Sequence, residues 1–288
     1  MTKNYFKKTP SALKRIKEIS LKGFSPSSLE TYIKNPKEYY FQKLLKLKKE
    51  KTNEGSADHK TIGLIFHETI ESLYKPFIGK YLEKKDLKEV LQNINKTLKN
   101  SFSANNELFN SGKNLILFEV IKSGIRVLIQ NELNDLNSGS KIKIIALEKP
   151  IKGTLNLKNS TKVAITGVID RIDEKNGVVR IIDYKTGLVS SSNLTIKEMS
   201  LICSDTLRTK AMQLMCYVWM YHKSTRCEKI SAGIISFRNL SNGTMKLKIK
   251  NSQTDLIYSS SIVSFEKELK RLISEIMDPK INFKDSEA

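Results

Sequence analysis

The sequence has few of the residues that stabilise secreted or fibrous proteins. Of its 288 residues only Cys203, Cys216 and Cys227 are cysteines, and their spacing matches no zinc-binding or haem-binding pattern. An odd number of cysteines argues against a disulfide framework. Six prolines and thirteen glycines exclude a collagen-like fibre and leave little room for long flexible linkers.

Long hydrophobic stretches are also missing. No apolar run approaches the roughly 18 residues that a membrane-spanning helix needs, and no apolar segment of the signal-peptide type follows the basic N-terminus. We therefore expect a cytoplasmic protein without membrane contact. Hydrophobic residues make up 39% of the chain, which is enough for a sizeable core and excludes a fully disordered chain.

Acidic residues are scarce relative to basic ones. Lysine and arginine number 50, against 30 aspartates and glutamates, which gives a formal net charge of +20. This charge suits a polyanionic partner such as nucleic acid, although an AT-rich genome would produce a similar excess of lysine. Because lysine binds phosphate as a point charge, we expect any contact with nucleic acid to be mostly with its phosphate backbone.

The hydrophobic pattern divides the chain into helices and strands. Helical spacing is found over residues 24–45, with a break at Asn35–Pro36, and over residues 61–75, 87–98, 113–129, 208–222 and 265–276. Runs rich in Ile and Val predict strands over residues 141–151, 162–173, 178–184, 230–237 and 244–250.

This order of elements predicts the domain organisation. From residue 113 to residue 237 it is helix, three strands, helix, strand, so we predict a single α/β domain over residues 24–288, with helices added at both ends. Residues 1–23 are basic and weakly patterned. We expect them to form a flexible or loosely docked arm.

Two aspartates face each other in a predicted hairpin. Asn176–Gly177 lies between two runs of Val and Ile and is a strong signal for a two-residue hairpin turn. In the register that this turn sets, Asp170 lies opposite Asp183, with Cβ atoms about 5 Å apart. Lys185 shares their face because it is two residues beyond Asp183.

Paired carboxylates at this distance repel each other unless a cation lies between them. Hard oxygen ligands favour Mg²⁺ or Mn²⁺, with water completing the coordination shell. A nearby lysine can orient an attacking water and offset phosphate charge, which suits hydrolysis of a phosphodiester. The alternative is a surface hairpin with charged edges, but Asp170, Asp183 and Lys185 interrupt apolar runs, where burial of charge is costly. The same register pairs Asp173 with Arg180, which we interpret as an exposed salt bridge on the opposite face.

Short motifs occur along the chain in a characteristic order. They are Ser25–Leu29 (SPSSL), Asn35–Tyr39 (NPKEY), Gly63–His67 (GLIFH), Gly167–Asp173 (GVIDRID), Asp183–Gly187 (DYKTG) and Gln213–Tyr217 (QLMCY). Each is weak alone, but in this order they resemble the PD-(D/E)XK nuclease superfamily, in its RecB/AddB-type branch. The resemblance runs from about residue 24 to residue 283. It implies a PD-(D/E)XK nuclease-like core of helix, three strands, helix and strand, with added N- and C-terminal helices.

The resemblance also assigns roles to the residues of these motifs. It implies that Asp170 and Asp183 bind metal, together with the backbone carbonyl of Tyr184. Lys185 would be the catalytic lysine. His67, from the upstream helix, would be the fourth metal ligand, although a histidine on an apolar helix is more often an ordinary core residue.

Other polar residues are weaker candidates. Gln213 and Tyr217 share one helix face, and the resemblance implies that they support the site and contact DNA; otherwise they read as half-buried helix residues. Lys210 and Arg208, which precede them, are candidate phosphate contacts, although most lysines are simply solvated. Glu148 is either an outer-shell carboxylate or merely exposed.

One feature departs from part of the superfamily. Some members carry an iron–sulfur cluster held by a cysteine just before the N-terminal proline and by a C-terminal cysteine group. Here Asn35 takes the first position, and the chain ends at Ala288, where the cysteine group would begin. We therefore expect no cluster. Because the family is often fused to helicase-like regions, we expect an excerpt of a longer protein or a chain that works with a helicase partner.

The function implied is a Mg²⁺- or Mn²⁺-dependent DNA nuclease. We expect an exonuclease that acts in DNA repair or recombination alongside a helicase. The alternative is a catalytically silent DNA-binding subunit of a helicase–nuclease complex, against which the intact Asp170, Asp183 and Lys185 count. A binding protein whose charge is only compositional is a third reading, which the ordered motifs disfavour.

Overall fold

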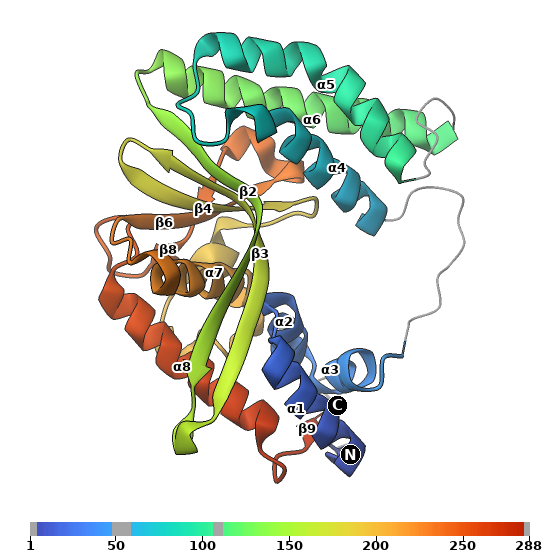
Figure 1. Ribbon diagram of the computed structural model, residues 1–288, viewed down its shortest axis with the longest axis vertical. Helices are drawn as coiled ribbons and strands as arrows, with labels where there is room; N and C mark the ends of the chain where they lie inside the picture. Colours follow the sequence, from blue (N-terminus) through green and yellow to red (C-terminus); the bar gives the residue numbers. More distant parts are fainter. Residues whose placement is uncertain (1–4, 48–58, 106–111, 285–288) are drawn as a thin grey trace.

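A five-stranded mixed sheet with helices on both faces organises the computed structural model, which describes residues 5–47, 59–105 and 112–284 (Figure 1). The strand order is β2–β3–β4–β6–β7, where β4 and β6 are parallel and the other neighbours antiparallel. The strands are β2 (Ile142–Asn156), β3 (Lys162–Lys175), β4 (Val178–Lys185), β6 (Ile230–Ser236) and β7 (Met245–Lys246).

Helices cover the two faces of this sheet as separate groups. On one face lie α4 (His59–Tyr74), α5 (Lys84–Ala104) and α6 (Gly112–Asn137); on the other lie α7 (Thr209–Thr225) and α8 (Ser259–Met277). The order α6, β2, β3, β4, α7, β6 is the predicted helix, three strands, helix, strand. The predicted α/β core is therefore confirmed. No helix in the described part of the chain is long and apolar enough to cross a membrane.

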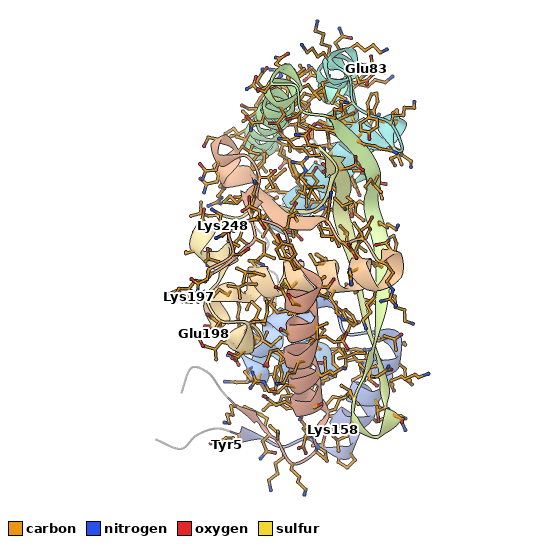
Figure 2. The ribbon with its side chains drawn as sticks, turned by 90° about the vertical axis from the view of Figure 1, so that its left-hand side faces the viewer. Tyr5, Glu83, Lys158, Lys197, Glu198 and Lys248 are labelled. Atoms are coloured by element: carbon orange, nitrogen blue, oxygen red, sulfur yellow. The ribbon has the colours of Figure 1, made fainter. Side chains whose placement is uncertain are left out.

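The long β2–β3 hairpin joins the two halves of the molecule. Figure 2 shows Glu83, just before α5, near one end of the molecule and Lys158, in the hairpin loop, near the other. Where β2 begins, Ile142 and Ile144 pack into the core beneath α4, α5 and α6. Towards the loop, Leu155 packs into the second core, with α7 and α8.

The N-terminal helices pack against that second core. They are α1 (Pro10–Lys22), α2 (Pro26–Lys34) and α3 (Pro36–Tyr39), which continues into a π-helical turn over Tyr40–Leu44. Ser25 caps α2, and Asn35 caps α3 by accepting from the backbone N–H of Glu38 at 3.2 Å. The predicted helix start and the break at Asn35–Pro36 are thus both observed.

Residues 10–22 form helix α1, in the segment where we expected a flexible or loosely docked arm. Thr9 caps α1 by accepting from the backbone N–H of Ala12 at 3.2 Å. Ala12, Ile16 and Ser20 are buried, one turn apart, against β3 and α8. The lysines between them made the segment look unpatterned, but small and apolar residues recur every four positions, which is the spacing of one helix face.

The two ends of the described chain lie together (Figure 1). Strand β1 (Tyr5–Phe6) pairs with β9 (Phe283–Lys284). The Lys8 ammonium donates to the backbone carbonyls of Glu275 and Asp278, at 2.9 and 2.7 Å, and so caps the C-terminal end of α8. Phe283 packs edge to face against Tyr32 of α2. These contacts fix α1–α3 against α8.

The segment predicted as one strand over residues 244–250 is divided in two. β7 extends the main sheet beside β6, whereas β8 (Lys248–Ile249) pairs with β5 (Thr195–Ile196) in a separate two-stranded sheet. The change takes place at Leu247, whose backbone N–H donates to the carbonyl of Ala232 in β6. The alternation of polar and apolar residues continues across this point, so the pattern alone does not show it.

Candidate active site

Three carboxylates form a row across β2, β3 and β4. The turn residues Asn176 and Gly177 have φ of 53° and 79°, as a two-residue hairpin of the predicted register requires. β3 and β4 pair in that register as far as Arg171 and Ile182, so that Asp170 and Asp183 are the next residues facing each other.

On the other side of Asp170, β2 contributes the third carboxylate of the row. Glu148 lies between two registered pairs, Leu147 with Arg171 and Lys149 with Ile169, and is therefore opposite Asp170. Asp170 thus occupies the middle of the row. Its side chain is buried, as is that of Asp183.

The structure brings His67 from α4 to this row, as the sequence motif implied. Its Nδ1 lies 3.1 Å from Oε1 of Glu148 and 3.7 Å from Oδ1 of Asp170. One ligand atom from each of these three residues lies within 4.8 Å of the others. Within the described residues, this is a group that can hold a metal ion.

Asp183 is held between a cation and an amide. The Lys185 ammonium lies 2.5 Å from its Oδ2, and Nε2 of Gln213 donates to its Oδ1 at 3.1 Å. Gln213 also lies 3.1 Å from the hydroxyl of Tyr217, one turn along α7. Both α7 residues are buried, and their predicted supporting role stays a prediction.

Tyr184 fixes Asp170 through its backbone. Its N–H donates to Oδ2 of Asp170 at 2.7 Å, and its ring lies on the opposite face of β4, against Phe66 and His67 of α4. The predicted metal contact through the Tyr184 carbonyl stays a prediction.

The charges in this cluster are strongly coupled. Burial, and then the adjacent Asp183 carboxylate, raise the pKa of Asp170 to about 7. Burial opposes the charge on Lys185, but Asp183 and Asp170 raise its pKa above the usual value. The pKa of His67 is also raised, because the hydrogen bond to Glu148 and the charge of Asp170 outweigh burial.

This donor set fits a hard divalent cation. Two carboxylates and one imidazole suit Mg²⁺ or Mn²⁺, which keep several waters. A dication would also offset the repulsion that raises the pKa of Asp170, since nearby positive charge favours the ionised carboxylate.

Lys210 and Arg208 lie at the start of α7, but each is engaged within the chain. The Lys210 ammonium pairs with Glu30 of α2 at 2.9 Å. Arg208 pairs with Asp205 at 2.7 Å and donates to the carbonyl of Thr195. Their predicted contact with phosphate stays a prediction.

The predicted pairing of Asp173 with Arg180 is observed, but it is not exposed. Asp173 is fully buried and accepts hydrogen bonds from Arg180 and from Arg171, its neighbour but one in β3. Our interpretation of a surface salt bridge was wrong because Glu132 of α6 reaches this face of the sheet and pairs with Arg171.

A cavity in the described part of the chain lies away from these residues. This cavity, of about 370 Å³, lies between α6, β4 and β6, and Glu132, Arg180 and Ile182 are among its lining residues. Ile182 and Asp183 are adjacent in a strand, so they point to opposite faces of the sheet. The carboxylate row is therefore outside this cavity, and the chemistry of its side chains rather than enclosed volume identifies it as the candidate site.

Glu148 is the site residue whose role we left open. The loop between β2 and β3 offers a usable signal. If Asn156 lies opposite Lys162 across this loop, counting back along β2 and forward along β3 places Glu148 opposite Asp170. The signal is weak because the loop has no Asn–Gly turn that would set the register.

The family of the chain follows from a match that covers the described fold from α2 onwards. A sequence model of the PD-(D/E)XK nuclease superfamily matches residues 23–288. The chain belongs to this superfamily. The row of carboxylates with Lys185 thus lies in a PD-(D/E)XK nuclease fold, and a nuclease-type function is supported.

Individual relatives are more distant. The chain is 31% identical over 179 residues to an ATP-dependent helicase/deoxyribonuclease subunit of Clostridium perfringens, covering 57% of this chain and 15% of the relative. The corresponding protein of Oenococcus oeni is 27% identical over 187 residues, covering 56% and 16%. An uncharacterised protein of Rickettsia bellii is 28% identical over 202 residues, covering 66% and 21%. The match thus spans about a fifth or less of the length of these relatives.

Proposed function

We propose that this PD-(D/E)XK chain is a metal-dependent deoxyribonuclease that hydrolyses phosphodiester bonds. The observation that carries the proposal is the row of Glu148, Asp170 and Asp183, with His67 beside one end and Lys185 beside the other. Such a row places metal-binding oxygens next to a lysine at a site whose outer side chains are partly exposed, which a purely structural ion-pair network does not need.

Each residue has a role in this proposal. Glu148, Asp170 and His67 hold Mg²⁺ or Mn²⁺, and Asp183 and the Tyr184 carbonyl contribute to the same site. When bound, such a metal polarises a phosphate and lowers the pKa of a coordinated water. Gln213, Tyr217 and Lys185 are not metal ligands in this proposal; they orient the other groups of the site.

Lys185 and the two α7 residues prepare the site for the substrate. The Lys185 ammonium beside Asp183 is placed to orient an attacking water and to offset the charge that develops on the phosphate. Gln213, itself bonded to Tyr217, keeps the Asp183 carboxylate in one orientation. Rigid placement of this kind contributes to catalysis because small misplacements of reacting groups are costly.

The substrate is DNA, bound mainly through its phosphates. The net charge of +20 supports salt-dependent binding that is largely independent of sequence. Lys210 and Arg208 exchange their partners Glu30 and Asp205 for phosphate in this proposal.

The proposed setting is DNA repair or recombination. The C. perfringens and O. oeni relatives are each named as a subunit of an ATP-dependent helicase/deoxyribonuclease, which supports DNA cleavage beside a helicase, in the same chain or as a partner. Exonuclease action is part of the same proposal. A cytoplasmic site of action fits this setting.

The deciding experiment is cleavage of end-labelled DNA. Single- and double-stranded DNA, linear and circular, are incubated with the protein and Mg²⁺, Mn²⁺ or EDTA. Lys185→Ala is compared with Lys175→Ala, which removes a lysine from the other end of the same hairpin, where it pairs with Asp135.

We expect cleavage that needs Mg²⁺ or Mn²⁺, disappears in Lys185→Ala and persists in Lys175→Ala. Cleavage of linear but not circular DNA would support the exonuclease mode. Metal-independent cleavage, or equal activity of Lys185→Ala, would contradict the proposed mechanism. Binding of DNA without cleavage under any condition would favour the catalytically silent role.

A further inference from the structure

We propose that Arg171 is a positioning residue that holds helix α4, and with it His67, at the correct distance from the carboxylate row. The inference deepens the proposed function, since it concerns the metal site on which that function depends. It names a residue that touches none of the metal-binding side chains and lies on the opposite face of β3 from Asp170.

Arg171 is a fully buried charge at the junction of three elements. Its Nη1 lies 2.7 Å from Oε1 of Glu132 on α6, and its Nε donates to Oδ2 of Asp173 in β3 at 2.7 Å. Its guanidinium carbon lies 5.0 Å from the ring centre of Tyr74 on α4. The Tyr74 hydroxyl donates to Oε2 of the same Glu132 at 2.7 Å, so the guanidinium, the carboxylate and the phenol form one closed group.

Two elements, helix α4 and strand β3, connect this group directly to the candidate site. On α4, Tyr74 and His67 are seven residues apart, which is two turns, so both side chains project from one face of the helix. On β3, Arg171 is the neighbour of Asp170. The helix therefore meets the strand at two polar points: Tyr74 at Arg171, and His67 at Asp170 and Glu148.

The chemistry of the group favours precise position over stability. Burying a guanidinium is costly, and well-packed apolar side chains often replace a buried ion pair without loss of stability. Apolar side chains can slide by a fraction of an ångström and repack, whereas a buried charge that loses its partner is strongly penalised. An Arg171–Glu132 pair with Tyr74 against it thus permits α4 few alternative positions.

Arg180 provides a natural control within the same network. It donates from two nitrogens to Asp173, at 2.6 and 2.8 Å, on the outer side of that carboxylate. Its side chain is 15% exposed and lines the cavity between α6 and β4. It shares the partner of Arg171, but it is not stacked on α4.

The test measures metal binding directly, with Mn²⁺ alone as the probe. Free Mn²⁺ is followed by electron paramagnetic resonance during titration of the wild type and of four variants. Tyr74→Phe removes only the bond to Glu132, and Arg171→Lys keeps the charge without the planar fork. Arg171→Met combined with Glu132→Gln removes the pair without leaving an unpaired carboxylate, and Arg180→Met is the control. Thermal unfolding of each variant is recorded alongside.

We expect the Mn²⁺ dissociation constant to rise about 10- to 100-fold in the Arg171 variants, the range typical of groups that orient metal ligands. Tyr74→Phe should change it in the same direction, without loss of folded structure. Arg180→Met should stay within about twofold of the wild type, as expected for a change outside the group. In the Arg171 variants, DNA cleavage should need a higher Mn²⁺ concentration, and its rate at saturating Mn²⁺ should be close to that of the wild type.

Wild-type Mn²⁺ affinity in folded Tyr74→Phe and Arg171→Lys would overturn the inference, and so would an equal loss in Arg180→Met. Failure of the double variant to fold leaves those two single variants to decide. A wild type that binds no Mn²⁺ would overturn both the inference and the proposed metal site. A wild type that binds Mn²⁺ in an Arg171-dependent manner but cuts no DNA would refute only the proposed nuclease activity.

Discussion

Glu148 in β2 faces Asp170 in the neighbouring strand β3, and the backbone of Glu148 is in the left-handed region, with φ of 41°. A residue other than glycine or asparagine rarely adopts this conformation, which costs of the order of 1–3 kcal/mol and concentrates at functional sites. The side chain that this backbone directs to the site lies 3.1 Å from His67. The local cost is therefore associated with a contact in the proposed metal site.

The first prediction concerns the charge of Glu148. Glu148→Gln keeps the size of the side chain but removes a hard anionic ligand, so we expect Mn²⁺ affinity to fall about 10- to 100-fold and cleavage at low metal to fall with it. Calorimetric titration with Mn²⁺ checks this. Glu174→Gln, which alters a half-buried carboxylate hydrogen-bonded to Tyr81 away from the site, is the matched control. Unchanged metal affinity in Glu148→Gln would remove Glu148 from the site.

A second prediction follows from the absence of a side chain at Gly167. A Cβ added there would lie 2.8 Å from Cε1 of Tyr217, closer than real Cβ contacts come. Tyr217 in turn bonds Gln213, which holds Asp183. We expect Gly167→Ala to displace this chain of contacts and to lower the cleavage rate about 10- to 100-fold, because misplacements of about 1 Å at a site have that effect.

The control for this substitution is Gly187→Ala. A Cβ at Gly187 would meet no atom within 4 Å, and its backbone does not have the left-handed φ that favours glycine. Both variants are compared for cleavage rate and for thermal unfolding. If Gly167→Ala cuts DNA at the wild-type rate, the orientation of Asp183 does not depend on the Tyr217 ring.

The part of the site that the sequence predicts is the part that local turn chemistry determines. Asn176–Gly177 specifies both the turn and the register, and that register places Asp170, Asp183 and Lys185 on one face. Glu148 is less accessible to such reasoning because the β2–β3 loop that sets its register has no Asn–Gly turn. His67 was identified only through the order of the motifs, because the spacing of residues along the chain does not show which helix contacts which strand.

Burial by distant segments accounts for two of the differences between expectation and structure. From the sequence we interpreted Asp173 and Arg180 as surface charges. In the structure α6 places Glu132 beside Arg171, a contact between residues 39 positions apart in sequence. From the sequence we interpreted residues 10–22 as part of an arm, but in the structure β3 and α8 cover Ile16. In both cases the strand or helix pattern was readable, but what packs on it depends on long-range topology.

A third prediction tests the docking of the N-terminal segment through Lys8. Its ammonium donates to two backbone carbonyls at the end of α8, where helix carbonyls lack intrahelical partners. Lys8→Met keeps the aliphatic stem but removes the donor, and we expect it to lower the free energy of unfolding by about 1–2 kcal/mol. Urea unfolding measures this.

Lys7→Met is the matched control for Lys8→Met because the Lys7 side chain is exposed. We expect it to change the free energy of unfolding by less than about 0.5 kcal/mol. Equal stability of the two variants would restore the view that this segment is a loosely docked arm.

The fourth prediction concerns acid stability and Glu266 of α8. Burial opposes ionisation of this carboxylate, but hydrogen bonds from Lys270, Trp219 and Lys223 lower its pKa to about 2. Because the pKa in the folded protein is below the usual 4.5, the ionised carboxylate stabilises the fold above about pH 4.5. That contribution is lost as the pH falls from about 4.5 towards 2.

Glu266→Gln isolates this contribution, since it keeps an acceptor for the Trp219 indole but removes the charge. The carboxylate is partly solvated, so we expect a loss of about 1 kcal/mol at pH 7 after allowance for solvent screening. The difference from wild type should shrink as the pH falls through 4.5, because protonation then neutralises the wild-type carboxylate as well. Fluorescence of Trp219, the single tryptophan of the chain, follows urea unfolding at each pH. A difference that is constant from pH 7 to pH 3 would show that packing, and not the ionised state of Glu266, stabilises this contact between α7 and α8.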